Sequence, residues 1–332
     1  FSFNKKYVII TIGEIMIQKQ FKNLDEQIEI LKYKGLIIKN EAYAKNVLLR
    51  ENYFFLSGYR HLFLKSITEK VYKPGTHFEE LYSLFLFDRR LRNILFKNLL
   101  IIENNLKSIS SYQLSKRYGY KEKDYLKESN FNTSPEKKRQ VNDLIKKMKR
   151  QIRSNSRENT ATIHYVNNYG YIPLWILVKV LSFGIVSEMY SVLKDEDQQA
   201  IADVYGIGKD DLVTYLPILS NYRNLCAHED ILYENRTHKQ IDDTIYHKML
   251  NIEKVDGEYK YGKDDLFALI IIMKELLQPE EFKSMMLELD NAITTLDYNL
   301  NAIKIGEVLN RMGFPKNWKE LMTIERGNKI NG

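Results

Sequence analysis

The sequence has 332 residues, of which 44% are hydrophobic and 28% charged, and its 6 prolines and 15 glycines leave room for long helices. The lone cysteine, Cys226, excludes an internal disulfide and a zinc site built from several cysteines, so we expect a cytoplasmic protein with no metal and no other cofactor. The net charge of +7 favours a polyanionic partner such as nucleic acid, although a lysine-rich composition by itself produces such values.

The spacing of apolar residues predicts helices along most of the chain. Residues 24–62 are expected to form two or three short helices, closed by a loop at Pro74 and Gly75. A long helix, or two in line, is predicted from residue 76 or 77 to about 117, because apolar side chains recur there at three- and four-residue steps. Gly119 then ends it. A serine and a proline at 134–135 mark the start of a strongly basic helix.

The second half of the chain continues this pattern. Residues 172–193 are strongly apolar but include charged residues and a proline, so a buried helix with a bend at Gly184 is expected rather than a membrane span. Further helices are predicted over 209–228, with Pro217 as a kink or a break, and around 266–277 and 281–300. Strand-like alternation is rare, so the expected fold class is all-α. We expect an N-terminal helical region in 1–75, a core in 76–240 with a basic insertion near 133–160, and a C-terminal helical region in 241–332.

The segment from residue 220 to 230 carries the residues best suited to catalysis. On a helix, Arg223 and His228 lie about 140° apart, and the arc between them holds small or polar residues that include Asn224. Histidine can act as acid or base near neutral pH, and arginine pairs with phosphate oxygens. This polar strip therefore suits metal-independent RNA cleavage by the ribose 2′-OH, with Asn224 orienting the phosphate or the imidazole. The alternative is a surface arginine and a histidine packed at a helix end, and Cys226 is expected to fill the core rather than act as a nucleophile.

Two acidic residues on the predicted long helix have candidate partners. Glu103 leans onto the apolar face of that helix, and a buried carboxylate is costly unless it is paired. Arg223 and Lys107 are both candidates for that partner. Asp88 and Arg92, four residues apart, are expected to form a helix-surface pair.

The basic helix is the expected electrostatic contact with RNA, because its cations can neutralise phosphates without reading sequence. The alternative is a solvated lysine face. The predicted RNA-binding residues are Lys137, Lys138, Arg139, Lys146, Lys147, Lys149, Arg150, Arg153 and Arg157.

Several stretches that occur in order across residues 24–320 resemble one family. They are Gly35-Leu36 through Asn52-Tyr53, Gly58-Tyr59, Phe87-Asp88-Arg89-Arg90-Leu91-Arg92, Ile102-Glu103-Asn104-Asn105-Leu106-Lys107-Ser108, Pro173-Leu174-Trp175, Ser182-Phe183-Gly184, and Gly313-Phe314-Pro315 with Trp318. They resemble the AbiD/AbiF abortive-infection family, and Arg223-Asn224-x-x-x-His228 is similar to the arginine–polar–x3–histidine signature of HEPN ribonucleases.

The resemblance implies a HEPN-type helical bundle with N- and C-terminal helical extensions, in which residues 76–240 form the HEPN core. It implies an endoribonuclease toxin of phage defence that acts on RNA as a homodimer and can be controlled by a small structured noncoding RNA, as in toxin–antitoxin systems. Arg223 and His228 match the catalytic pair, Asn224 the polar position, and Glu103 the acidic position on the preceding long helix. The acidic Glu229 and Asp230 follow His228 and would repel phosphate.

Two other functions are compatible with the same residues. A non-catalytic HEPN-fold module that holds RNA without cutting it would use the same net charge and the same basic helix. A protein-interaction component of a defence system would instead have negligible affinity for RNA at physiological salt.

Overall fold

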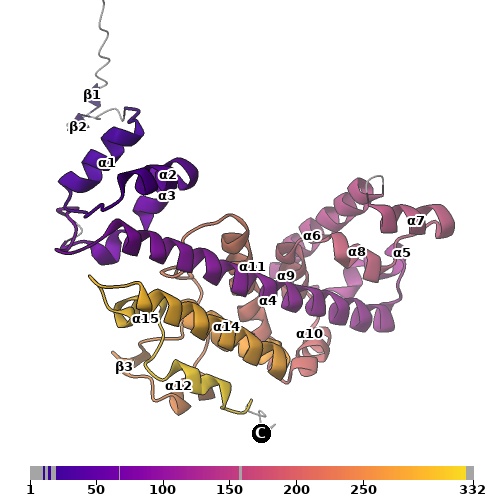
Figure 1. Ribbon diagram of the computed structural model, residues 1–332. Helices are drawn as coiled ribbons and strands as arrows, with labels where there is room; N and C mark the ends of the chain where they lie inside the picture. The colour runs from indigo at the N-terminus through magenta and orange to yellow at the C-terminus, as the bar shows by residue number, and fades with distance from the viewer. Residues whose placement is uncertain (1–9, 12–13, 16–19, 67, 157–158, 327–332) are drawn as a thin grey trace, which may run out of the picture. The chain divides into compact units, whose positions relative to one another are not determined.

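The computed structural model describes residues 10–11, 14–15, 20–66, 68–156 and 159–326 and is predominantly helical, which confirms the predicted all-α class (Figure 1). The strands within these residues form two antiparallel hairpins of two-residue strands. Strand β1 (Ile10–Thr11) pairs with β2 (Glu14–Ile15), and β3 (Lys254–Val255) pairs with β4 (Glu258–Tyr259).

The chain divides into two compact units, with the boundary between Tyr82 and Ser83. The first unit contains α1 (Leu24–Tyr33), α2 (Glu41–Glu51), α3 (Tyr53–Gly58) and the 3-10 turn η1 (His61–Phe63). Its asparagines begin the helices: the side chains of Asn23, Asn40 and Asn52 each accept a backbone N–H of the first turn that follows. Its core is formed by Ile28, Leu31, Ala44, Val47, Leu48, Leu56 and Phe63.

Helix α4 (Phe78–Tyr118) begins in the first unit and continues as a single helix through the start of the second. The predicted apolar stripe is buried in the second unit at Leu84, Leu91, Leu95, Ile102 and Leu106. Gly119, in a left-handed conformation at φ 92°, ends the helix as predicted.

The second unit continues with α5 to α15 and three further 3-10 turns. Their bounds are α5 (Glu122–Tyr125), η2 (Glu128–Asn130), α6 (Pro135–Asn155), α7 (Thr160–Tyr169), α8 (Leu174–Val180), α9 (Phe183–Ser191), α10 (Asp195–Ala202), η3 (Asp203–Tyr205), α11 (Lys209–Ala227), α12 (Ile245–Met249), α13 (Leu266–Leu276), α14 (Pro279–Tyr298), α15 (Ile305–Met312) and η4 (Trp318–Met322).

Two local predictions needed correction, and several short helices were not predicted. The apolar run breaks at Leu181 and Ser182 rather than at Gly184, because the Ser182 hydroxyl accepts the Ile185 N–H and starts α9. Gly184 instead lies in the first turn of α9, where an added Cβ would stand 3.6 Å from Ser220 Oγ on α11. At the start of α6, the Ser134 hydroxyl caps no backbone N–H. The short helices α5, α7, α10, α12 and α15 were not predicted.

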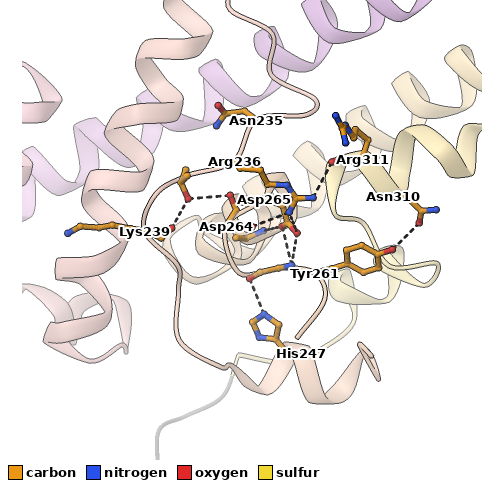
Figure 2. Close-up of polar contacts among 12 residues, drawn as sticks. Asn235, Arg236, Lys239, His247, Tyr261, Asp264, Asp265, Asn310 and Arg311 are labelled. Carbon is orange, nitrogen blue, oxygen red and sulfur yellow. Dashed lines mark hydrogen bonds and ion pairs between the residues drawn. The ribbon is translucent and has the colours of Figure 1, made fainter. Parts of the chain in front are cut away.

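The buried carboxylate of Asp265 holds the start of α13 and the loop that precedes it (Figure 2). It accepts the N–H of Gly262 and, as the N-cap of α13, the N–H of Ala268, and it pairs with Arg236 at 2.9 Å. Burial raises its pKa to about 6. The Gly262 carbonyl lies 3.0 Å from Nε2 of the buried His247, whose pKa burial lowers. This cluster therefore fixes the loop that precedes α13.

Within the described ranges, every helix is too short or too polar to cross a membrane.

Candidate functional site

Helix α11 presents the predicted polar strip to solvent and its opposite face to the core. Ile218, Leu219 and Tyr222 are buried, whereas Asn224 and Ala227 are exposed. The amphipathic pattern of the sequence therefore predicted correctly which face of α11 packs on the core. Pro217 lies inside α11 without ending it.

The end of α11 places the His228 ring at the surface. His228 is the C-cap residue, and its N–H donates to the Asn224 carbonyl at 3.0 Å. Glu229 follows in the left-handed conformation, at φ 56°, and the Asp230 N–H returns to the Leu225 carbonyl at 3.2 Å. This is the 6→1 hydrogen bond of a Schellman ending, with glutamate at the position that glycine usually occupies. The ring of His228 is exposed and has no hydrogen-bond partner among the described residues.

A buried ion pair on α4, formed by Glu103 and Lys107, binds the side chain of Arg223. Its Nε donates to Glu103 Oε2 at 3.4 Å, and Lys107 Nζ donates to the other carboxylate oxygen at 2.7 Å. The Glu103 side chain is 5% exposed and that of Arg223 is 32% exposed. Both candidate partners of Glu103 therefore bind it at once, and two cations flank one buried carboxylate. Only Nε of Arg223 is paired with Glu103. Among the described residues, the two terminal nitrogens of the guanidinium have no hydrogen-bond partner, so they can bind a ligand.

A second contact fixes the same arginine. The Arg223 guanidinium lies 5.7 Å from the centroid of the Phe96 ring, also on α4. Phe96 and Glu103 are seven residues apart, so they lie on one face of α4. That face therefore sets where the guanidinium can point.

The pair of Asp88 and Arg92 is buried, which corrects the prediction of a helix-surface pair. Their side chains are 0% and 3% exposed, and they form a short ion pair. The Asp88 carboxylate also accepts the N–H of Leu232 at 3.0 Å and of Tyr233 at 2.8 Å. Arg92 donates to the Asp230 carbonyl at 3.1 Å. The two residues therefore clamp the segment that follows His228 against α4.

The sequence model of the Abi-like protein family matches residues 46–234. The chain belongs to the Abi-like protein family. Membership associates it with abortive infection, a form of phage defence. Searches of curated proteins and of solved structures found no match.

The region that the Abi-like family model matches includes the Glu103–Arg223 contact and the Asp88–Arg92 pair. It starts within α2 and ends at residue 234, directly after the segment that Asp88 binds. Arg223, Asn224, His228 and Glu103 all lie inside it, as does the basic helix α6. The Asp265 cluster lies outside it.

The basic helix of this Abi-like protein is only partly free to bind an anion. Asp143 lies 4.0 Å from Arg139 and 3.7 Å from Lys146, and Glu188 on α9 pairs with Lys147 at 2.6 Å. Lys137 is half-buried. Arg157 lies outside the described residues. The predicted residues that are exposed and have no ion pair within the described part of the chain are Lys138, Lys149, Arg150 and Arg153.

Cys226 is 8% exposed, and burial raises the pKa of its thiol to about 12. The sulfur is therefore protonated at neutral pH and fills the core, as predicted.

The residues that sequence reasoning undervalued are Asp88 and Arg92. A signal was present: Asp88 follows Leu84 by four residues and precedes Leu91 by three, so it had to share their buried face. The bond from Asp88 to the backbone beyond His228 had no such signal, because it joins positions 144 and 145 residues apart.

Proposed function

We propose that this Abi-like protein is a metal-independent endoribonuclease toxin of the HEPN type, which cleaves RNA by attack of the ribose 2′-OH. The observation that carries the proposal is the fixed, half-exposed Arg223 guanidinium at 3.4 Å from the buried Glu103, on the same polar strip that ends at the exposed His228. Because a buried carboxylate already fixes the guanidinium, its side chain does not have to reorient when negative charge develops on the phosphate.

The reaction requires two proton transfers and one stabilised anion. A base takes the proton of the 2′-OH as the new 2′-O–P bond forms, and an acid protonates the departing 5′-oxygen as the P–O5′ bond breaks. The products are a 2′,3′-cyclic phosphate and a 5′-hydroxyl. His228 serves as one of the two proton carriers, and Arg223 binds the non-bridging oxygens through its terminal nitrogens. Asn224 orients the phosphate, and Glu103 is a positioning residue that acts through Arg223.

The second proton carrier comes, in this proposal, from His228 of a second copy, because a homodimer with the motif at its two-fold axis brings both rings to one phosphate. The exposure of His228 and Asn224 leaves the strip open to such a partner. The unpaired cations of α6 bind further phosphates of the substrate or of a structured noncoding RNA that restrains the toxin.

The test is RNA cleavage by purified protein in excess EDTA. Wild type should produce cyclic-phosphate ends, and His228→Ala should lower the rate by roughly 10²- to 10⁴-fold, the usual contribution of a positioned acid or base. His238→Ala is the matched control, because His238 is also exposed and lies in the same unit but not on the strip. Equal cleavage by wild type and His228→Ala defeats the proposal.

Binding measured on the same samples separates the rival functions. A chain that binds RNA with strong salt dependence but never cuts it is a non-catalytic RNA-binding module. Negligible binding at physiological salt indicates a protein-interaction component of the defence system.

A further inference from the structure

Helices α7 and α8 contact each other, and α5 lies close to them (Figure 1). An exposed cluster of aromatic rings lies on these two helices and on the segment before α5. Its rings belong to Tyr120, Tyr165, Tyr169, Tyr171 and Trp175. The centroid of Tyr120 is 5.4 Å from that of Trp175 and 5.7 Å from that of Tyr171. Tyr169 joins the cluster through Tyr165 at 5.4 Å and Tyr171 at 6.3 Å.

Three of the five rings remain open to solvent although they touch their neighbours, and Tyr165 and Tyr171 are half-buried. Tyr169 is 56% exposed, Trp175 42% and Tyr120 40%. Neighbouring rings are tilted by 35° to 56° rather than stacked face to face, so they do not cover each other. A large aromatic surface that is gathered at one place and left uncovered marks a binding site more often than an accident of composition.

The backbone beneath the cluster is firmly held. The Leu174 N–H donates to the Tyr120 carbonyl at 3.2 Å, and the Ile172 N–H donates to the Glu122 carboxylate at 2.5 Å. The buried Tyr125 hydroxyl donates to the Ile172 carbonyl at 2.9 Å. The rings are therefore presented on a preorganised surface, which lowers the entropy lost when a ligand stacks on them.

A cationic cleft of about 380 Å³ begins beside the rings, where Glu122 joins both features. Its cations are Lys123, Lys127, Lys149 and Arg153, none of which has an ion pair within the described residues. The one acid that lines it, Glu122, is occupied by the Ile172 N–H. Lys121 extends the positive charge onto the rings, with Nζ 4.8 Å from the Tyr171 centroid.

From this juxtaposition we propose that the surface binds a single-stranded stretch of nucleic acid, with bases stacked on the aromatic cluster and the backbone phosphates in the cationic cleft. Exposed rings beside cations that have no ion pair suit a single strand of nucleic acid. Each base can stack on a ring, and each phosphate linkage carries a negative charge that a cation can neutralise. A duplex hides its base faces, so it gains from the cleft but not from the rings. The proposal shares with the proposed function the premise that RNA binds and the α6 cations Lys149 and Arg153, and it does not depend on cleavage.

The test measures binding of a fluorescein-labelled 20-nucleotide oligouridine and of a blunt RNA duplex by anisotropy. His228→Ala chains are used so that any cleavage is slow on the time scale of the measurement. The double variant Tyr169→Ala/Trp175→Ala should weaken single-strand binding roughly 10-fold or more, because it removes two rings on which bases stack. Duplex binding should change little. Tyr169→Phe/Trp175→Phe keeps both rings and should restore the affinity, whereas Tyr298→Ala, at the exposed end of α14, should have no effect.

Two further readouts separate stacking from a loss of structure. The chain has two tryptophans, and Trp175 is exposed whereas Trp318 is only 2% exposed. A single strand that stacks on Trp175 should therefore quench the tryptophan fluorescence. Trp175→Phe should abolish this quenching while binding persists. The slope of log affinity against log salt should be unchanged in the ring variants and smaller in Lys149→Gln/Arg153→Gln. Single-strand affinity that survives loss of both rings, or an equal loss for the duplex, overturns the proposal and leaves a protein partner as the occupant of this surface.

Discussion

At the scale of single residues, Asp88 has the most demanding position in the second unit. It is fully buried and negatively charged, and its partners include the Arg92 guanidinium and two backbone N–H groups. Such a group stabilises the fold only while every partner is present, because an unpaired buried charge costs more than the pair contributes.

We therefore expect Asp88→Ala to lower the free energy of unfolding by about 3–5 kcal/mol, because it leaves Arg92 buried without its carboxylate. Asp88→Asn keeps the shape and an acceptor for one N–H but removes the charge, so it should be nearly as destabilising. Urea denaturation followed by circular dichroism gives the measurement.

Asp195→Ala is the control for this experiment. Asp195 also pairs with a cation, Lys209 at 2.6 Å, but its side chain is 70% exposed. Solvent screens that pair, so its loss should leave the denaturation midpoint nearly unchanged. Equal midpoints for Asp88→Ala and Asp195→Ala would show that the Asp88 cluster does not hold the segment after His228.

At the scale of helices and their ends, two elements of the C-terminal region depend on one glycine. Gly313 is the C-cap of α15, at φ 79°, and its backbone lies directly against the Asp265 carboxylate that caps α13. A Cβ at residue 313 would overlap that carboxylate. The carboxylate cannot move away without losing the N–H groups of Gly262 and Ala268.

Gly313→Ala should consequently destabilise the protein by more than backbone strain alone, which costs about 1–2 kcal/mol for a left-handed residue. Gly206 isolates that strain, because it ends η3 at φ 70° with open space around it. Thermal denaturation of the two alanine variants gives the comparison. A fall in Tm that is no larger for Gly313→Ala than for Gly206→Ala would contradict the packing of α15 against the α13 cap.

Helices were predictable from the sequence where their apolar pattern is long. Helix α4 repeats its buried residues over many turns, so its course from 78 to 118 agrees with the predicted 76–117. Helices α5, α7, α10, α12 and α15 are 4 to 10 residues long and were missed, since so short a pattern has no distinct period. The break before α9 was misplaced because Ser182 can cap a helix as readily as Gly184 can bend one.

At the scale of the whole molecule, the sequence indicated which residues of the candidate site share the strip but not what anchors them. Arg223 and Glu103 are 120 residues apart, and only the folded chain shows Nε of one at 3.4 Å from the carboxylate of the other. Lys107 was the local alternative, and the structure has both bonds. The proposed homodimer is inferred from the chemistry of the strip, because the reaction needs two proton carriers and the strip supplies one histidine.

That chemistry leads to a prediction about two copies acting together. If each cleavage needs His228 from both chains, a dimer of one wild-type and one His228→Ala chain is inactive. Equal amounts of the two chains, unfolded and refolded together, would form mixed dimers at random. The activity per wild-type chain should then fall to about half, and that of the whole mixture to about one quarter of the same amount of pure wild type.

The same mixing with His238→Ala should leave the activity of the mixture equal to that of pure wild type, because His238 lies off the strip. A mixture of wild type and His228→Ala that retains one half of the activity would show that each chain cuts independently. In that case a group on the same chain must carry the second proton. Asp230 and Glu229, which follow His228 at the surface, would be the first residues to replace, because carboxylates can accept a proton from the 2′-OH.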